Sequence, residues 1–305
     1  MRTIPIGQSS LTSSVLAYGC WRLAGTSAPG DVRPEGREAG KKAAIAAYEA
    51  GYTLFDHADV YCDGVAEEIF GEVLREVSGM REGILIADKC GIRLSGSPAS
   101  APYRYDFSAE YIIWSCEQAL RRLGVETIDI YQLHRPDWLA DWNEVAEAFT
   151  RLRKQGKVRE FGVSNFSPSQ VAALQKACDR PLIVHQVEIS LLRLACFEDG
   201  TLDQCQSEKI TPLAWSPLGG GQLMVGQEDS GLRVGTALDQ IAKRHGVTRS
   251  TLALAWLLRH PSGIVPIVGS TKPERIRESV NAAEIQLSRE EWYSLLEVAR
   301  GARLP

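Results

Sequence analysis

The chain has 305 residues and a mass of 33.5 kDa, enough for two average domains or one large α/β barrel. A net charge of -4 and a pI near 5.8 exclude a strongly basic surface for nucleic acid or for an anionic membrane. No apolar run approaches the ~18 residues of a membrane span. The N-terminus lacks an apolar signal core, and seven cysteines without a C-x-x-C pair suit a reducing compartment. We therefore expect a cytoplasmic protein that binds neither nucleic acid nor membrane.

The N-terminal segment predicts a small hairpin ahead of the main fold. Residues 3–6 are extended and Gly7 is a turn, while residues 11–18 hold either the return strand or the first strand of the main sheet. Loops then run to residue 37, and the first of them carries Trp21. A helix over 38–50 follows and ends before Gly51.

From residue 52 onward, predicted strands and helices alternate. Strands are expected at 52–55, 84–87, 128–133, 158–163, 182–187, 210–215 and 264–268. Helices are expected at 65–77, 108–123 with Ser108 as N-cap, 141–154, 168–177, 236–245, 249–259, 273–283 and 289–299. Short, continuously apolar strands are typical of a sheet buried on both faces. The pattern predicts one (β/α)8 TIM barrel domain over residues 1–305, with the N-terminal hairpin and extra C-terminal helices.

A doubly wound open sheet is the alternative fold. Its dinucleotide-binding form carries a G-x-G-x-x-G turn after the first strand, and no such turn is present here. The barrel is therefore the simpler interpretation.

Four ionisable residues lie at or just past predicted strand ends. Asp56 follows the strand at 52–55, Tyr61 comes five residues later, and Lys89 and His134 end two further strand-like runs. A barrel of parallel strands would gather all four into one pocket. Each residue alone also has an ordinary structural explanation: a turn carboxylate, a packed tyrosine or a core histidine. Their joint occurrence at three strand ends favours a catalytic site.

The chemistry of these four groups is complementary. A tyrosine has a pKa of about 10 and needs a nearby cation, here Lys89, to stabilise its phenolate. Asp56 would keep that lysine charged, and His134 would polarise the oxygen that Tyr61 protonates. Such a set suits delivery of a proton to a carbonyl oxygen while a hydride reaches the carbonyl carbon.

These residues stand in recognisable motifs. Phe-Asp-His-Ala-Asp-Val-Tyr, Asp-Lys-Cys-Gly and Leu-His-Arg-Pro-Asp resemble the catalytic tetrad segments of the aldo-keto reductases. The likeness continues through residues 162–166, 185–188, 214–219 and 268–275, and it is strongest to the bacterial branch of generic oxidoreductases. The resemblance implies that Tyr61 is the general acid in reduction and the base in oxidation. It also implies that Lys89, paired with Asp56, tunes Tyr61, and that His134 orients the carbonyl.

The resemblance further implies a nicotinamide cofactor. Ser164, Asn165 and Gln186 would hold the carboxamide, and Trp215 would stack on the ring at a position where many members carry tyrosine. Barrels commonly bind phosphate in the loops after the seventh and eighth strands, and glycine-rich turns let backbone N–H groups approach an anion. The residues expected there are Ser216, Leu218, Gly220, Gly269 and Ser270. A turn before a helix, core packing and a flexible glycine loop are the structural alternatives.

The helix that begins near residue 273 favours NADPH over NADH. The resemblance implies that Arg275 contacts the 2′-phosphate of NADP and that Glu278 meets the adenine amine. Many members have lysine where Gly269 stands and asparagine where Ser279 stands. Lys272 or Arg277 either compensates for these departures or is a solvated charge of the helix. Trp21 is expected at the substrate mouth. The histidines lack metal-site spacing, so no metal is predicted.

The predicted function is reversible, NADPH-dependent reduction of an aldehyde or ketone. The expected partner is a small carbonyl compound, and the protein is expected to be a monomer or a weak homo-oligomer. Two alternatives remain open from the sequence. One is an NADPH-binding redox-sensing module with little turnover, and the other is a lyase that forms a Schiff base at Lys89.

Overall fold

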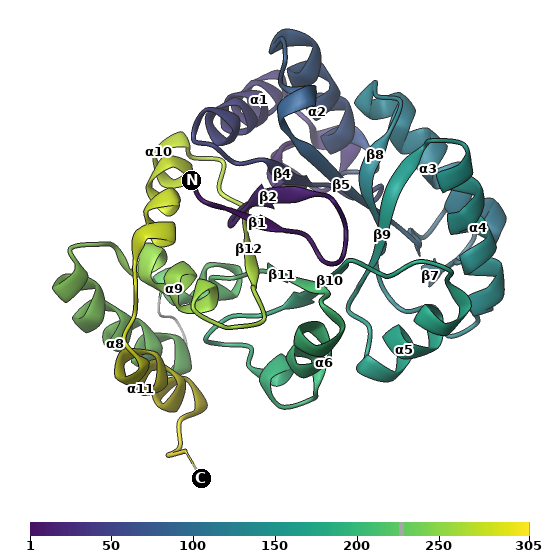
Figure 1. The fold of residues 1–305 in the computed structure, drawn as a ribbon. Coiled ribbons are helices and arrows are strands. Elements are labelled where there is room, and N and C mark those ends of the chain that lie inside the picture. The colour runs from purple at the N-terminus through teal and green to yellow at the C-terminus, as the bar shows by residue number, and fades with distance from the viewer. Residues whose placement is uncertain (226–228, 305) are drawn as a thin grey trace.

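Eight parallel strands close into a barrel in the computed structural model, which describes residues 1–225 and 229–304 (Figure 1). In order around the ring they are β3 (Ala17–Gly19), β4 (Leu54–Asp56), β5 (Leu85–Cys90), β8 (Ile128–Leu133), β9 (Val158–Ser164), β10 (Val184–Glu188), β11 (Thr211–Trp215) and β12 (Val265–Val268). The ring closes where Ile267 pairs with Ala17 and Val268 with Tyr18. The predicted (β/α)8 barrel is confirmed, and the open-sheet alternative is wrong because the last strand pairs with the first.

Helices surround the ring of strands (Figure 1). They are α1 (Pro34–Glu49), α2 (Val65–Glu76), α3 (Ala109–Leu123), α4 (Trp142–Lys154), α5 (Pro168–Ala177), α6 (Thr201–Glu208), α7 (Gln222–Val225), α8 (Asp229–His245), α9 (Arg249–Leu258), α10 (Pro273–Ser279) and α11 (Arg289–Arg300). Single 3-10 turns occur at Cys20–Arg22, Pro29–Asp31, Arg81–Gly83, Ala195–Phe197, Gly219–Gly221 and Val280–Glu284. The extra C-terminal helices are present: α8 and α11 pack together at the lower left of Figure 1.

The helix boundaries follow from local capping. Ser108 caps α3 as predicted, because its Oγ accepts from the N–H of Tyr111 at 3.3 Å, and Gly124 ends the helix with a φ of +68°. A reciprocal capping box between Ser167 and Gln170 starts α5. These bonds satisfy N–H groups that the first turn of a helix leaves without partners.

Several predicted boundaries were wrong. Helix α1 begins at Pro34 rather than residue 38, since proline suits the first helical position, and residues 229–235 already belong to α8, ahead of the predicted start at 236. Helix α6 was not predicted, and the helix expected at 273–283 becomes 3-10 after Ser279. The loop after β5 contains an unpredicted two-stranded sheet, β6 (Ile92–Arg93) with β7 (Arg104–Tyr105).

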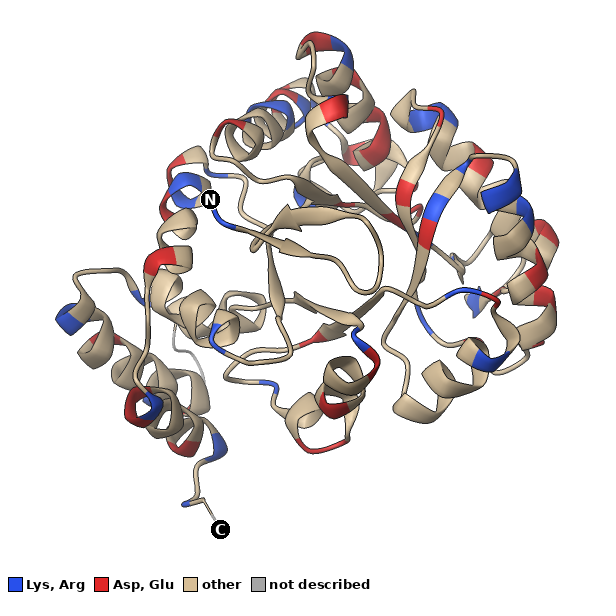
Figure 2. Cartoon of the chain, viewed as in Figure 1, with Lys and Arg blue, Asp and Glu red and all other residues tan. Residues whose placement is uncertain are grey.

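The predicted N-terminal hairpin plugs one end of the barrel. Strands β1 (Thr3–Pro5) and β2 (Thr12–Ser14) pair antiparallel and cross the N-terminal ends of the barrel strands, at the centre of Figure 1. The return strand and the first barrel strand are therefore separate elements. Ile6 and Leu11 are buried against the residues that fill the barrel, which include Leu54, Leu85, Ile130, Val184, Leu213 and Val265. Figure 2 shows that charged residues lie mainly on the surrounding helices and are few on the hairpin.

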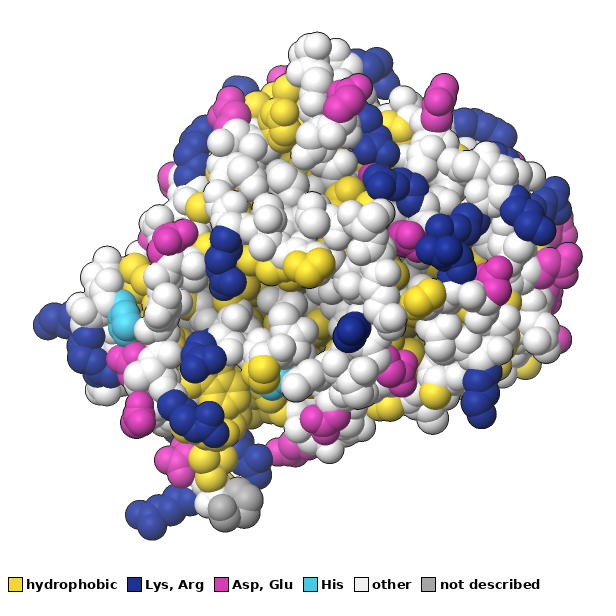
Figure 3. All heavy atoms as spheres, viewed as in Figure 1, with side chains coloured by type: hydrophobic (Ala, Val, Ile, Leu, Met, Phe, Trp, Pro, Cys, Tyr) yellow, Lys and Arg dark blue, Asp and Glu magenta, His cyan; other side chains and the backbone are white. Residues whose placement is uncertain are grey.

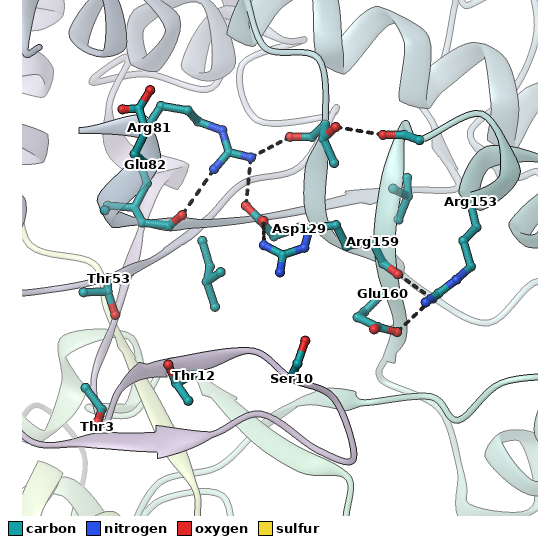
Figure 4. A pocket seen from close by; sticks show the side chains of 16 residues that line it. Thr3, Ser10, Thr12, Thr53, Arg81, Glu82, Asp129, Arg153, Arg159 and Glu160 are labelled. Carbon is teal, nitrogen blue, oxygen red and sulfur yellow. Dashed lines mark hydrogen bonds and ion pairs between the residues drawn. The ribbon is translucent and has the colours of Figure 1, made fainter. Parts of the chain in front are cut away.

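Beside the hairpin lies a hollow of about 1010 Å³. Hydroxyl residues line one side and arginines the other (Figure 4), and Lys and Arg side chains gather on this face where β8 and β9 begin (Figure 3). Arg81 and Arg159 both pair with buried Asp129, at 3.0 and 2.8 Å, and Arg153 pairs with Glu160 at 3.0 Å. Each guanidinium thus already has a carboxylate. The hollow lies at the strand N-termini, at the opposite end of the barrel from the predicted catalytic residues.

Candidate active site

The four residues predicted to be catalytic meet at the C-terminal ends of the strands. Asp56 is the last residue of β4, Lys89 lies in β5, and His134 directly follows β8. The Lys89 Nζ atom is 2.7 Å from Asp56 Oδ1 and donates to the backbone carbonyl of His57 at 2.6 Å. It also lies 5.1 Å from the centroid of the Tyr61 ring, whose own centroid is 6.0 Å from that of His134. The structure therefore brings a phenol, an ammonium, a carboxylate and an imidazole together.

The loop that carries Tyr61 is held from two sides. The backbone N–H groups of His57 and Asp59 donate to carbonyls of β5 at 2.8 and 3.0 Å, so the loop extends along that strand. The Asp59 carboxylate accepts from the Tyr111 hydroxyl at 3.1 Å and from Ser115 Oγ at 2.8 Å, both on α3. These bonds fix the position of Tyr61 relative to β5.

The charges of Lys89 and Tyr61 depend on each other. Burial alone would lower the pKa of Lys89, but the Asp56 carboxylate and Tyr61 raise it above its ordinary value, so the ammonium persists. Burial raises the pKa of Tyr61 to about 12, although the Lys89 ammonium opposes this rise. The predicted lowering by Lys89 is thus present, but burial outweighs it. At neutral pH the phenol holds its proton and can donate it.

His134 is a neutral imidazole. Burial, followed by the charges of Lys89 and Arg135, keeps the pKa of His134 well below its usual value. Its Nδ1 atom is buried and has no hydrogen-bond partner among the residues that the structure describes. A neutral ring at this place has one N–H that it can direct at a carbonyl oxygen.

The residues predicted to hold the nicotinamide form one connected group. Asn165, with a left-handed φ of +61°, donates from Nδ2 to Ser164 Oγ at 2.8 Å and to the His134 carbonyl at 3.0 Å. Its Oδ1 accepts from the indole N–H of Trp215 at 3.0 Å. Three of the four residues expected around the nicotinamide, namely Ser164, Asn165 and Trp215, are therefore in contact.

Gln186 has an additional contact that the sequence did not reveal. Its Nε2 atom donates to Asp56 Oδ1 at 2.7 Å, the same oxygen that Lys89 contacts. The amide comes from β10 and reaches the carboxylate from across the barrel. Gln186 thus helps to stabilise the buried charge of Asp56.

The two predicted phosphate loops lie on the neighbouring strands β11 and β12. In the described part of the chain, no atom outside the adjoining residues lies within 4 Å of where a Cβ at Gly220 or Gly269 would stand, so both loops border open space. Ser216 has a left-handed φ of +49°, and Leu218 precedes the Gly219–Gly221 turn. Ser270 Oγ accepts from the N–H of Lys272 at 3.1 Å, just before α10. Open loops and a free helix start are compatible with a bound phosphate group.

The charged residues of α10 differ in their availability. Arg275 is exposed and has no side-chain hydrogen bond or ion pair within residues 1–225 and 229–304, and Glu278 is half-buried. Arg277 instead pairs with Glu49 at 3.2 Å, so it is poorly placed to replace a missing ligand. Ser279, one of the departures from the family pattern, donates to the Arg275 carbonyl at 2.8 Å within the helix. Arg275 is the residue of this helix that best fits a phosphate.

The remaining predicted residue, Trp21, lies in the turn after β3 with 55% of its surface exposed. The Arg22 guanidinium sits 5.0 Å from its ring centroid. No group of three or more His, Cys, Asp or Glu side chains in the described residues could hold a metal ion. Likewise, none of the helices described here is long and apolar enough to cross a membrane.

A closed barrel with these four groups at its C-terminal mouth has the arrangement expected of a barrel oxidoreductase. The model of the aldo/keto reductase family matches residues 15–300, and the chain belongs to this family.

Relatives and solved structures agree with this assignment. The chain is 42% identical to a 6-dehydroglucose reductase of Novosphingobium aromaticivorans, over 98% of this chain and 96% of that protein. It is 41% identical to the uncharacterized oxidoreductase YcsN of Bacillus subtilis, over 84% and 86%. A crystal structure of an aldo/keto reductase from Klebsiella pneumoniae with NADP and acetate superimposes with a TM-score of 0.78 at 28% identity, covering 96% of this chain and 93% of that one. The resemblance to the bacterial oxidoreductase branch is therefore confirmed.

Proposed function

We propose that the protein catalyses the NADPH-dependent reduction of an aldehyde or ketone to an alcohol, and the reverse reaction. The observation that carries this proposal is the buried Lys89–Asp56 pair beneath the Tyr61 ring, with the neutral His134 beside it. Membership of the family and the NADP found in the Klebsiella pneumoniae structure support the choice of cofactor. Two relatives are 6-dehydroglucose reductases, from Novosphingobium aromaticivorans and Agrobacterium fabrum, so sugar-derived aldehydes are suitable first substrates.

Each residue of the group has a distinct task in this reaction. NADPH supplies the hydride when it is bound. Tyr61 donates its proton to the carbonyl oxygen, and the Lys89 ammonium stabilises the phenolate that remains. Asp56 keeps Lys89 charged, while the single N–H of His134 orients the carbonyl oxygen. In oxidation the same phenolate removes the proton from the alcohol.

The cofactor would lie across the C-terminal mouth of the barrel. Trp215 would stack on the nicotinamide, and the carboxamide would meet Ser164, Asn165 and Gln186. The phosphates and the adenine end would be held by Ser216, Leu218, Gly220, Gly269, Ser270, Arg275 and Glu278. The open glycine loops, and an Arg275 guanidinium without a partner among the described residues, support this placement.

Replacement of Tyr61 tests the proposed acid. Tyr61→Phe removes one hydroxyl and keeps the ring, so NADPH should bind within about 2-fold of wild type in a fluorescence titration. Turnover of a reactive aldehyde should fall roughly 10²- to 10⁴-fold, the usual contribution of a positioned acid. Equal turnover in this variant would refute the role of Tyr61.

Replacement of Arg275 tests cofactor choice. Arg275→Ala should raise the Kd for NADPH at least about 10-fold, since a guanidinium–phosphate pair is lost, and leave the Kd for NADH nearly unchanged. Arg277→Ala is the matched control, because that arginine lies in the same helix but pairs with Glu49. An unaltered NADPH-to-NADH affinity ratio in Arg275→Ala would contradict the assignment.

The two alternatives make different predictions. A Schiff-base lyase needs an uncharged lysine nitrogen, whereas Asp56 raises the pKa of Lys89 and keeps it protonated. Borohydride added with substrate should therefore trap no covalent adduct. A redox sensor would release its cofactor slowly and show a single turnover, so steady-state oxidation of NADPH over many turnovers separates it from a reductase.

A further inference from the structure

Arg135 is a cation at the catalytic mouth that the predicted chemistry does not use. It directly follows His134, and its guanidinium carbon lies 5.6 Å from the centroid of the Trp215 ring. It is also near enough to His134 to contribute to the low pKa of that imidazole. Its guanidinium has no hydrogen bond or ion pair with any residue in the described ranges 1–225 and 229–304. Five N–H donors are therefore available at this point of the site.

Asn165 holds both the backbone just before Arg135 and the Trp215 ring that the guanidinium faces. Asn165 Nδ2 donates at 3.0 Å to the carbonyl of His134, which belongs to the peptide group leading into Arg135. Asn165 Oδ1 accepts at 3.0 Å from the indole of Trp215, the ring beneath the guanidinium. The guanidinium of Arg135 thus has ordered neighbours, which lowers the entropic cost of fixing this side chain when a ligand binds.

Two acidic residues of this end of the barrel are already engaged. Asp56 is bound to Lys89, and Asp137 accepts backbone N–H groups of Phe107 and Leu139 at 2.9 Å. Neither carboxylate pairs with Arg135. The planar guanidinium therefore keeps its N–H groups for a ligand, and its geometry fits two neighbouring oxygen atoms.

An aromatic rim lies on loops near this cation. Tyr103 and Tyr105 come from the loop after β5, and Trp138 lies three residues beyond Arg135. Their rings meet edge to face, with centroids 5.8 Å apart for the two tyrosines and 6.4 Å for Tyr105 and Trp138. Trp138 is 86% exposed and Tyr103 50% exposed, so these rings are not part of the core. Grouped, exposed aromatic rings commonly mark a binding surface for C–H groups.

We propose that Arg135 is a specificity-determining residue that binds hydroxyl oxygens next to the reacting carbonyl, so that the substrate is a polyhydroxylated, sugar-like aldehyde or ketone. The guanidinium donates to two adjacent hydroxyl groups, and the rim formed by Tyr103, Tyr105 and Trp138 packs on the C–H face of the same carbon skeleton. This inference rests on the proposed function, because it concerns the same mouth of the barrel.

Two aldehydes of three carbons test the proposal. D-glyceraldehyde carries two hydroxyl groups and propanal carries none, and succinate semialdehyde adds a carboxylate as a third probe. Wild type, Arg135→Met and Arg135→Lys are compared by NADPH oxidation. Arg289→Met is the control, because that arginine also lies over an aromatic ring, Tyr293 at 5.2 Å, but on α11.

The expected result is a selective loss. Arg135→Met should lower kcat/KM for D-glyceraldehyde roughly 10- to 100-fold, as for the loss of charged hydrogen bonds, mainly by raising KM. Activity on propanal and the Kd for NADPH should stay within about 2-fold, Arg135→Lys should recover part of the loss, and Arg289→Met should match wild type.

Four results would overturn the proposal. These are an equal loss with propanal, a larger loss with succinate semialdehyde, weaker binding of NADPH, or a wild type that prefers propanal to D-glyceraldehyde. The second result would indicate an anion site, and the third would assign Arg135 to the cofactor. If wild type reduces propanal while any of these holds, the proposed function stands and only the role of Arg135 fails. If wild type reduces none of the three aldehydes, the proposed function fails as well.

Discussion

The Lys89–Asp56 pair allows a quantitative prediction about stability. Its side chains are 0% and 4% exposed, and the two atoms in contact are 2.7 Å apart. Lys89→Met leaves the Asp56 carboxylate buried with Gln186 as its remaining side-chain donor among the described residues. Removal of one partner from a buried ion pair costs about 3–5 kcal/mol. The bond from Gln186 persists, so we expect a loss near the lower end, about 3 kcal/mol.

Removal of both charges should cost less than removal of one. In Lys89→Met/Asp56→Asn no unpaired charge remains, and Gln186 can still donate to the carbonyl oxygen of the introduced amide. The free energy of unfolding of the double variant should therefore be about 2 kcal/mol higher than that of Lys89→Met. The coupling energy from the four proteins of this double-mutant cycle isolates the contribution of the pair.

Urea unfolding without cofactor measures these quantities. Seven tryptophans provide a fluorescence signal, and linear extrapolation gives the free energy of unfolding in water. Cofactor is left out because binding to the folded state would raise the apparent stability. If Lys89→Met unfolds within about 1 kcal/mol of wild type, or if the double variant is no more stable than the single one, the pair is not the desolvated unit described here.

Three further variants test groups around the barrel by the same unfolding assay. Burial raises the pKa of Asp59 to about 7, so the folded state keeps a proton that the unfolded chain releases, and stability falls as the pH rises from about 4 to 7. Asp59→Asn lacks this titration, so its stability relative to wild type should rise by about 3 kcal/mol between pH 5 and pH 8; a constant difference would contradict the pKa. Gly162→Ala places a Cβ 2.6 Å from the Val184 carbonyl oxygen and should lower the free energy of unfolding by about 1–3 kcal/mol. An unchanged urea midpoint would show that β9 and β10 can move apart to make room. Arg122→Met removes the bonds of 2.7 and 3.2 Å to the fully buried Glu67 and should cost about 3–5 kcal/mol, with partial recovery when Glu67→Gln is added; no recovery would mean that charge is not the cause.

The sequence was sufficient for features that depend on local pattern. Continuous apolar runs marked the strands, and Asp56, Lys89 and His134 stood at their ends, so a barrel alone implied that they meet. Boundaries were missed where the signal is short. Helix α6 has eight residues, too few for a clear period, and Pro34, which begins α1, stands in a stretch whose glycines and charges are typical of a loop.

Contacts across the barrel could not be predicted in the same way. Gln186 reaches Asp56 from a strand on another side of the ring, and Trp215 meets Asn165 through its indole nitrogen. Both contacts depend on which way a side chain points once the ring has closed. The availability of the Arg135 guanidinium was missed for a related reason, since a sequence does not show which arginines will pair with a carboxylate.

The plug at the base of the barrel has a consequence for how the chain matures. Ile6 and Leu11 leave the ribosome long before Val265, yet they pack in one cluster with it, and the ring itself closes between residues 17 and 267. Contacts between such distant positions form slowly, because the chain between them loses conformational entropy before the contacts add any stabilisation. The apolar lining of a nascent chain therefore stays exposed to water until residues 265–268 have been synthesised, which makes shorter nascent chains substrates for chaperones.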